Sequence, residues 1–280
     1  MQIQVADQRI LLLKDKISPE IAKTTAWQKK TSAFGTLSKV TSFLSKPKDE
    51  EFTVTYSEHR YEPFWHVVAK ARYEYTRASS YYVPVNGKEV KSVTLQDTKY
   101  DVTNGKINIP VLEYCLQEEL EDKIIDGLTS VPAPQLRTHL SLTAHEIQGQ
   151  LKDHVDAADI LVPPQARISA IMRDSLAGMI KGIQADTILD ERVEVTHVDL
   201  YYRPIYAYKF SWISKQKEAI LEVDGLTGDC TTGNRIFSEY IGKVLNQDFL
   251  FDVGADAAGL IIPGGSIMVK AAKRYIDAKN

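Results

Sequence analysis

Tyr61-Glu62-Pro63-Phe64-Trp65-His66-Val67-Val68 and Tyr202-Arg203-Pro204-Ile205-Tyr206-Ala207-Tyr208-Lys209 are two degenerate copies of one pattern. Each copy consists of a tyrosine, a charged residue and a proline, followed by an aromatic-rich run. An internal repeat indicates architecture before any single residue indicates chemistry. We therefore interpret the copies as the starts of equivalent hairpins in two related modules.

Turn and strand signals accompany both copies. Asn86-Gly87 and Asp224-Gly225 accept the positive φ angles of tight hairpin turns, and β-branched and aromatic residues precede both pairs. Upstream of each hairpin, residues 52–57 and 193–200 alternate with the period of two that a strand requires. Each half of the chain therefore predicts an antiparallel sheet.

Helix signals come before each sheet and between the two. Ser18-Pro19-Glu20 combines a capping hydroxyl, a proline suited to the first helical position and an early negative charge. After Pro163-Pro164, apolar residues recur three and four positions apart through Ile183. Leucines every fourth residue among glutamates predict an acidic helix over residues 112–124, and the capping box Thr143-Ala144-His145-Glu146 predicts another helix.

These signals predict an α+β protein made of two tandem helix-plus-antiparallel-sheet modules with a C-terminal helix. The proline-containing connector near residues 129–134 interrupts helix periodicity and is the expected joint. The N-terminal α+β module then covers residues 1–130. The C-terminal module covers residues 135–280, including a glycine-rich loop at Pro263-Gly264-Gly265-Ser266 and the terminal helix.

Composition limits the class of protein. The chain has 280 residues and a hydrophobic fraction of 44%, which is enough for a substantial core. A formal net charge of -3, from 34 basic and 37 acidic residues, disfavours a nucleic-acid partner. The two cysteines, Cys115 and Cys230, are too few for a disulfide framework, and residues 1–7 lack the pattern of a secretory signal. We expect two reduced thiols and a cytoplasmic protein.

The longest apolar tract lies near the end, within residues 249–276. Asp252, Asp256 and several glycines interrupt it, whereas a membrane-spanning helix needs about 20 mostly apolar residues. Integral membrane insertion is therefore disfavoured. Two interpretations stay open, a peripheral membrane contact and packing on the sheet.

The chain lacks a complete catalytic or metal-binding motif. The His145-Glu146 pair has Gly149 where a zinc-peptidase helix needs its second histidine. Gly254–Gly259 has the glycine spacing of a phosphate-binding loop, but no lysine and hydroxyl residue follow it. His66 and His197 lie on predicted strands beside aromatic residues, where structural histidines are commoner than general bases. We expect no cofactor, no metal and no catalytic residue.

Aromatic residues on the sheets form the candidate binding surface. The chain has 14 tyrosines and 3 tryptophans, several of them within the repeat. They either fill a core or present a recognition face, and with Lys70, Arg72 and Arg77 a contact to single-stranded nucleic acid is a further alternative. We expect the tyrosines that follow the first copy to lie outside. The candidate binding residues are Tyr73, Tyr75, Tyr81, Tyr82, Arg72 and His66.

The second copy carries a family resemblance. Residues 204–210 and 219–229, with the ending Val223-Asp224-Gly225-Leu226-Thr227-Gly228, resemble the strand, the hairpin and the threonine–glycine ending of PepSY-type modules. The resemblance covers about residues 164–232, and a weaker copy lies near 52–103, which lacks that ending. It implies a cystatin-like helix on an antiparallel sheet, with a role in peptidase regulation or in binding within larger assemblies.

The sequence therefore favours a non-enzymatic binding or adaptor protein that acts through aromatic sheet surfaces, with another protein as its partner. Two alternatives stay open. One is a hydrolase whose site is assembled between the two modules. The other is a membrane-peripheral protein that uses residues 249–276.

Overall fold

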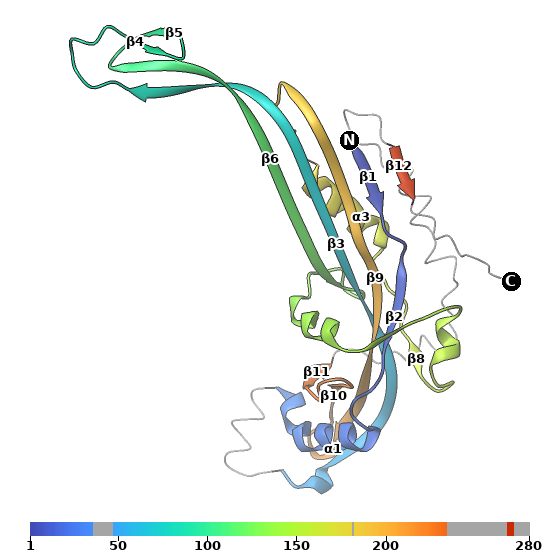
Figure 1. Ribbon diagram of the computed structural model, residues 1–280. Coiled ribbons are helices and arrows are strands. Elements are labelled where there is room, and N and C mark those ends of the chain that lie inside the picture. The colour runs from blue at the N-terminus through green and yellow to red at the C-terminus, as the bar shows by residue number, and fades with distance from the viewer. Residues whose placement is uncertain (36–46, 181, 234–267, 272–280) are drawn as a thin grey trace, which may run out of the picture.

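Three long antiparallel strands form the centre of the fold (Figure 1). β3 (Phe52–Pro84) is the middle strand, with β6 (Lys106–Asp126) paired along one edge and β9 (Thr187–Trp212) along the other. They give the molecule an elongated, twisted shape. The computed structural model describes four stretches of the chain, residues 1–35, 47–180, 182–233 and 268–271.

The two copies of the repeat pair with each other. In the antiparallel register of β3 and β9, Tyr61 lies opposite Pro204 and Pro63 lies opposite Tyr202. The charged residues between them also face each other, since the Arg203 guanidinium lies 3.0 Å from the Glu62 carboxylate. Each copy is therefore the complement of the other across the sheet, because opposite charges on directly opposed residues stabilise a strand pair.

The predicted fold of two tandem α+β modules is wrong. Strands hold 52% of the residues and helices 21%, and one large mixed sheet takes strands from both halves of the chain. The repeat misled the prediction because it marks two neighbouring strands of one sheet. Sequence periodicity identifies such strands but does not identify their pairing partners.

Shorter strands extend the sheet around the long ones. β1 and β2 run parallel to β9, β10 pairs antiparallel with its C-terminal part, and β11 follows β10. β12 runs parallel to β1, β7 pairs with β2, and β8 runs parallel to β3. A separate hairpin of β4 and β5 lies at one end. The bounds are β1 Gln2–Val5, β2 Arg9–Leu13, β4 Ser92–Leu95, β5 Thr98–Asp101, β7 Ala144–Glu146, β8 Ile160–Leu161, β10 Lys217–Asp224, β11 Cys230–Gly233 and β12 Met268–Ala271.

Helices cover parts of the sheet and close its cores. α3 (Ile168–Met179) buries its apolar stripe in the main core, which also contains Trp65. α1 (Pro19–Lys29) lies over the β9–β10 end of the sheet. A second cluster forms around Phe64, whose side chain points to the face opposite that of Trp65. The 3-10 helices are Lys30–Phe34, Asp49–Glu51, Pro134–Ser141, Leu151–His154 and Ile213–Lys215.

Some of the predicted helices are confirmed and others are wrong. The helix start at Ser18 is confirmed, because its hydroxyl oxygen accepts a hydrogen bond from the Ile21 N–H at 3.4 Å. The helix after Pro163-Pro164 is also confirmed as α3. The acidic helix predicted over residues 112–124 is strand β6, and the capping box at Thr143 leads into strand β7.

The C-terminal predictions fall mainly outside the described residues. Of the apolar segment 249–276, only residues 268–271 are described, and they form β12 in place of the predicted terminal helix. The glycine-rich loop lies outside the described residues. In the part of the chain that is described, no helix combines the length and apolar character needed to cross a membrane.

Candidate functional site

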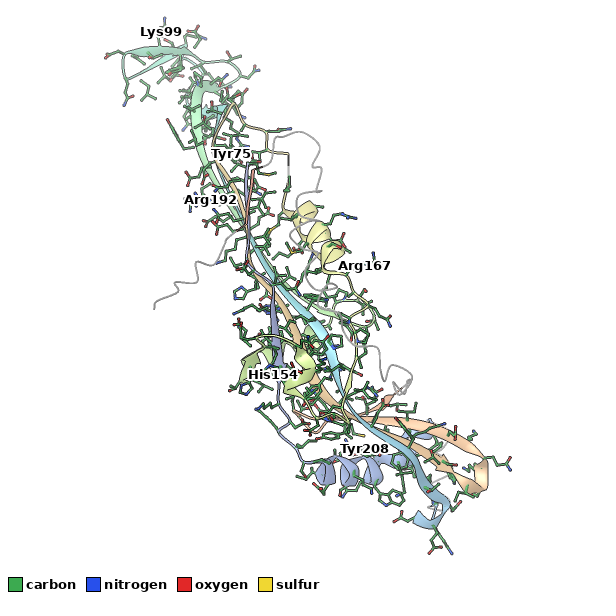
Figure 2. All side chains as sticks on the ribbon, turned by 90° about the vertical axis from the view of Figure 1, so that its right-hand side faces the viewer. Tyr75, Lys99, His154, Arg167, Arg192 and Tyr208 are labelled. Carbon is green, nitrogen blue, oxygen red and sulfur yellow. The ribbon has the colours of Figure 1, made fainter. Side chains whose placement is uncertain are left out.

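β3 and β6 continue as a two-stranded ribbon beyond β9. β9 last pairs with β3 at Thr76, whereas β3 and β6 stay paired up to Pro84, which lies opposite Lys106. The β4–β5 hairpin lies at the tip (Figure 1). Figure 2 shows Lys99 at this end of the molecule, far from Tyr208 near the other end. We call residues 77–84 and 106–113 the distal ribbon.

A row of exposed apolar side chains runs along β6 and onto the distal ribbon. Its members are Leu112, Tyr114, Leu116 and Leu120, with exposed fractions of 53%, 77%, 57% and 67%. They occupy even-numbered positions of one strand and therefore share one face. We call these four residues the β6 row. Single exposed apolar residues are ordinary, but a contiguous set marks an interaction site.

Charged residues fill the same face on β3. Arg72 lies opposite Glu118, with its guanidinium 3.0 Å from that carboxylate, and it also pairs with Glu74. Lys70 lies opposite Leu120. The solvated face therefore carries charged residues on β3 and, at the edge, the apolar β6 row, which Glu118 interrupts between Leu116 and Leu120.

The predicted binding residues that follow the first copy separate into a buried and an exposed group. The Tyr73 side chain is 1% exposed, and its hydroxyl donates to the Met179 carbonyl oxygen at 2.6 Å. Tyr75 is partly buried against the same core. The expectation that Tyr73 lies outside is wrong, because α3 covers that face. Tyr81 and Tyr82 are 54% and 65% exposed on the distal ribbon.

The other two predicted residues, Arg72 and His66, lie on the face that carries the β6 row. Arg72 is the ion-paired residue described above. Sequence reasoning missed the β6 row because it assigned residues 112–124 to a helix. The signal that identifies the row is the apolar residue at alternate positions from 112 to 116, which is the strand period.

His66 and His197 come together from the two copies' strands. Their ring centroids lie 5.7 Å apart. His66 Nε2 is 3.1 Å from an Asp122 carboxylate oxygen, whereas its Nδ1 is 4.0 Å from Asp199, which Arg9 holds through two hydrogen bonds. Burial lowers the His66 pKa against the opposing effect of Asp122. The lowered pKa favours the neutral imidazole.

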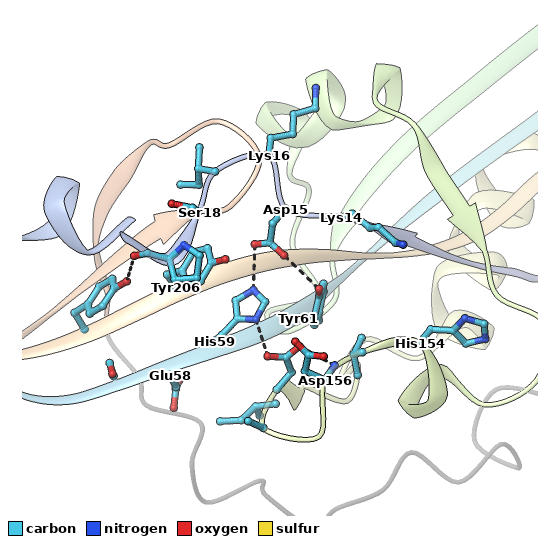
Figure 3. Close-up of a pocket in the computed structure, with 18 of the residues that line it drawn as sticks. Lys14, Asp15, Lys16, Ser18, Glu58, His59, Tyr61, His154, Asp156 and Tyr206 are labelled. Carbon is cyan, nitrogen blue, oxygen red and sulfur yellow. Dashed lines mark hydrogen bonds and ion pairs between the residues drawn. The ribbon is translucent and has the colours of Figure 1, made fainter. Parts of the chain in front are cut away.

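A pocket of about 1250 Å³ (Figure 3) includes Tyr208, which Figure 2 shows near the end of the molecule opposite the distal ribbon. Three segments line it together with Tyr206 and Tyr208 of β9: residues 14–19 at the start of α1, residues 56–59 and Tyr61 of β3, and residues 153–156 and 158–160 leading into β8. Segments from both halves of the chain therefore form its wall.

His59 joins two of these segments to β3 at the floor of the pocket. Its Nδ1 lies 2.7 Å from an Asp159 carboxylate oxygen and its Nε2 lies 3.2 Å from one of Asp15. The Tyr206 ring stacks on the imidazole at 4.4 Å, and the Tyr61 hydroxyl donates to Asp15 at 3.4 Å. Burial disfavours the charged imidazolium, but the hydrogen bonds to the two aspartates outweigh it and raise the His59 pKa to about 9.

This arrangement suits a structural clamp better than a catalytic base. At neutral pH the His59 imidazolium carries protons on both nitrogens and donates both to carboxylates. A general base must instead offer a free nitrogen lone pair to the substrate. The hydrogen bonds of His59 to Asp15 and Asp159 hold the segments around residues 14–19 and 153–160 in place.

Metal and thiol chemistry find little support in the described stretches. Across residues 1–35, 47–180, 182–233 and 268–271, no group of three or more His, Cys, Asp or Glu side chains is arranged to hold a metal ion. Cys115 and Cys230 are free thiols on separate strands, and burial raises the pKa of Cys230. A raised pKa lowers the thiolate fraction and hence the reactivity of that thiol.

Comparison of the chain with protein-family models, with curated proteins and with solved structures finds no match. The PepSY-type resemblance therefore stays a prediction. The functional proposal rests on the geometry of the site itself.

Proposed function

We propose that this chain is a non-enzymatic adaptor that binds another protein through the β6 row and Tyr82 of the distal ribbon, which lies on the same face. The observation that carries the proposal is the exposure of four large apolar side chains on one face of one strand. Three of them, Leu112, Tyr114 and Leu116, are contiguous along that face, and such a set is typical of a surface that is covered by a partner.

The expected energetic gain supports binding by this surface. Alternate residues of a strand lie about 6.8 Å apart, so Leu112, Tyr114 and Leu116 form a continuous strip. Covering one large apolar side chain stabilises a complex by roughly 1 to 2 kcal/mol before the cost of association. Tyr82 adds an aromatic ring on the same face, and aromatic rings are enriched where proteins bind one another.

The hydrolase alternative has its best place in the pocket at His59. That pocket combines segments of both halves of the chain, as the alternative requires. Its histidine, however, donates both ring N–H groups to Asp15 and Asp159 and has a pKa near 9. This protonation state opposes general-base catalysis at neutral pH, so we favour the adaptor. The membrane-peripheral alternative rests on residues of which only 268–271 are described.

Site-specific photocrosslinking tests the proposed function. The photoreactive residue benzoylphenylalanine replaces Tyr114 in the full chain, which is expressed in the cells that produce it. A matched variant carries the same residue at Ile213, which is 58% exposed but lies on a short 3-10 helix far from the row. We expect a discrete crosslinked protein from position 114 and none of the same mass from position 213.

A second crosslinking variant tests whether the crosslink depends on the apolar residues of the β6 row. Replacing Leu112 and Leu116 by serine in the Tyr114 crosslinking chain removes apolar contact area and leaves the charged residues of β3 intact. We expect the crosslinked band to weaken at least about tenfold, because two buried leucines contribute well over 1.4 kcal/mol. Identical bands from positions 114 and 213, or a band unaffected by the serines, would contradict the proposal.

A further inference from the structure

We infer that the partner contributes an extended segment that pairs with the outer edge of β6 as an additional antiparallel strand, with apolar residues alternating with lysine or arginine. This inference rests on the proposed function and specifies the chemistry of the partner. Strand addition to a sheet edge is an established mode of peptide recognition, in which the backbone supplies affinity and alternate side chains supply specificity.

The outer edge of β6 is available to another strand. Among the described strands, β6 pairs with β3 alone, in one unbroken register from residue 106 to residue 126. The backbone groups along its other edge therefore point away from the sheet. This holds from the part of β6 before its C-terminal end to the tip of the distal ribbon. An edge of this length with large apolar side chains is a template for another strand.

The direction of the backbone groups follows from bonds at both ends of the ladder. Val85 N–H donates to the Gly105 carbonyl and Gly127 N–H to the Pro63 carbonyl, so odd-numbered residues on the β6 side face β3. Antiparallel strands alternate between residues that face the partner and residues that face away. Even-numbered residues, including the β6 row, therefore turn their N–H and C=O groups outward. Pro110, which has no N–H, fits an outward position.

Near the C-terminal end of β6, another segment of the same chain already pairs with this edge. Asp126 N–H donates to the Val131 carbonyl at 2.9 Å, and Ala133 N–H donates to the Ile124 carbonyl at 2.8 Å. Ile125 and Pro132 form an antiparallel bridge there. The connector that follows β6 therefore folds back as a short additional strand on even-numbered backbone groups. The partner segment pairs with the rest of the same edge, on the N-terminal side of residue 122.

The side chains of β6 specify the composition of the added strand. The β6 row favours apolar residues at alternate positions of the partner strand, because directly opposed side chains on one face interact. Between residues 106 and 126 the strand carries six acidic residues and two lysines. A partner with lysine or arginine at the remaining positions complements that charge. Its basic side chains lie on the face opposite the β6 row and meet the acidic residues of that face, which are Glu113, Glu119 and Glu121.

The same charges disfavour a second copy of this chain as the occupant. A twofold antiparallel pair of β6 strands centred on Leu116 places Glu113 opposite Glu119, and one centred on Gln117 places Glu113 opposite Glu121. Like charges directly opposed across strands are destabilising. A pair centred on Tyr114 opposes Leu112 and Leu116 and places Glu113 opposite Cys115, so the repulsion acts in some self-pairing registers and not in that one.

A proline scan of the edge tests the inference on the full chain. Glu118→Pro removes an outward N–H and obstructs strand addition, while its position leaves the ladder with β3 intact. Glu118→Ala is the matched control, because it loses the same carboxylate and the same ion pair with Arg72 but keeps the N–H. The probe is a fluorescein-labelled peptide of about nine residues in which valine alternates with lysine, and its binding is measured by anisotropy.

We expect the peptide to bind the wild-type chain and the Glu118→Ala variant with affinities that agree within about threefold. The Glu118→Pro variant should bind at least about tenfold more weakly, since it loses a backbone hydrogen bond and the adjoining contacts. A peptide in which glutamate replaces lysine should bind more weakly to all three chains. Amide hydrogen exchange of the odd-numbered residues of β6 confirms that the proline variant retains its pairing with β3.

Equal affinity of the proline and alanine variants, or no preference for lysine over glutamate, would overturn strand addition. The photocrosslinking result separates this failure from failure of the proposed function. Crosslinking at Tyr114 that persists in the Glu118→Pro chain shows that the row binds a protein by side chains alone. Loss of that crosslink in the proline variant and its retention in the alanine variant supports strand addition.

Discussion

At the scale of single residues, the prolines of the repeat lie where a long strand changes its neighbour. β3 pairs with β8 at Arg60 and Tyr61 and with β6 from Phe64 onward, so Pro63 lies at the change. β9 pairs with β2 up to Tyr202 and with β10 from Ile205, so Pro204 lies at the corresponding change. A proline is tolerated there because no ladder hydrogen bond needs its missing N–H. The proline in each copy was predictable as a strand start or edge position, but its true role requires knowledge of the neighbours.

The close approach at Gly127 gives a residue-scale prediction. A Cβ at this position would lie 2.5 Å from the Pro63 carbonyl oxygen, and backbone cannot move aside as a flexible side chain does. We expect Gly127→Ala to lower the free energy of unfolding by roughly 1 to 3 kcal/mol. Gly182→Ala is the control, because an added Cβ there meets nothing within 4 Å. Urea denaturation that shows equal stability of the two variants would refute the strained contact.

The His59 clamp predicts a pH dependence of stability. The folded-state pKa of about 9 lies above the ordinary value of 6.5, so the clamp's contribution is complete below pH 6.5 and is lost as the pH rises through 9. The shift corresponds to at most about 3 kcal/mol, and we expect about 1 to 2 kcal/mol because the site is partly solvated. The measurement is urea denaturation of wild type and His59→Gln from pH 6 to 9.5. The stability difference between them should shrink with rising pH, and a constant difference would be inconsistent with a charged clamp.

At the scale of elements, β6 shows why a strand was predicted as a helix. Leucines at 112, 116 and 120 recur every four residues, and four is close to one helical turn and also a multiple of the strand period of two. The spacing therefore places them on one face of either element. Cys115 and Tyr114 favour a strand, and the glutamates favour a helix, so local propensity does not decide. Pairing with β3 decides it. By contrast, α1 and α3 were predictable because caps and apolar stripes are local signals.

The β6 row predicts that binding and stability respond separately to substitution. Replacing Leu112, Leu116 and Leu120 by threonine keeps β propensity and removes apolar area that is already exposed to solvent. We expect the free energy of unfolding to change by no more than about 0.5 kcal/mol per site. The valine–lysine peptide should lose most of its affinity. Matched thermal denaturation and anisotropy measurements check both results, and a large loss of stability would show that the row is part of a core.

At the scale of the whole molecule, the two copies of the repeat pair with each other within a single sheet. Tyrosine faces proline and Glu62 faces Arg203 because the copies run antiparallel beside each other. A sequence shows that two segments are similar but not whether they pair or form separate modules, since that choice depends on contacts across about 140 residues of chain. The prediction of the exposed site residues was limited in the same way. Tyr81 and Tyr82 were identified correctly as exposed, but Tyr73 was not, because its burial depends on α3.

The distal ribbon should be dispensable for folding. Among the described strands, those of the ribbon pair only with each other beyond Thr76, where β9 ends its pairing with β3. We expect a chain in which an Asn-Gly turn replaces residues 78–112 to retain the rest of the sheet, because that turn suits a two-residue hairpin. Its unfolding should stay cooperative, and the crosslink from position 114 should weaken. Circular dichroism that shows loss of the remaining sheet would refute this independence.

Residue-resolved amide hydrogen exchange along β6 tests the central claim most directly, because the claim is that this strand presents a free edge able to receive another strand. In the chain alone, amides of odd-numbered residues from 113 to 121 should exchange slowly and those of even-numbered residues from 112 to 120 should exchange fast. Adding the valine–lysine peptide should protect the even-numbered amides and leave the odd-numbered ones unchanged. Even-numbered amides that are already protected without the peptide, or that stay unprotected at saturating peptide, would contradict the account.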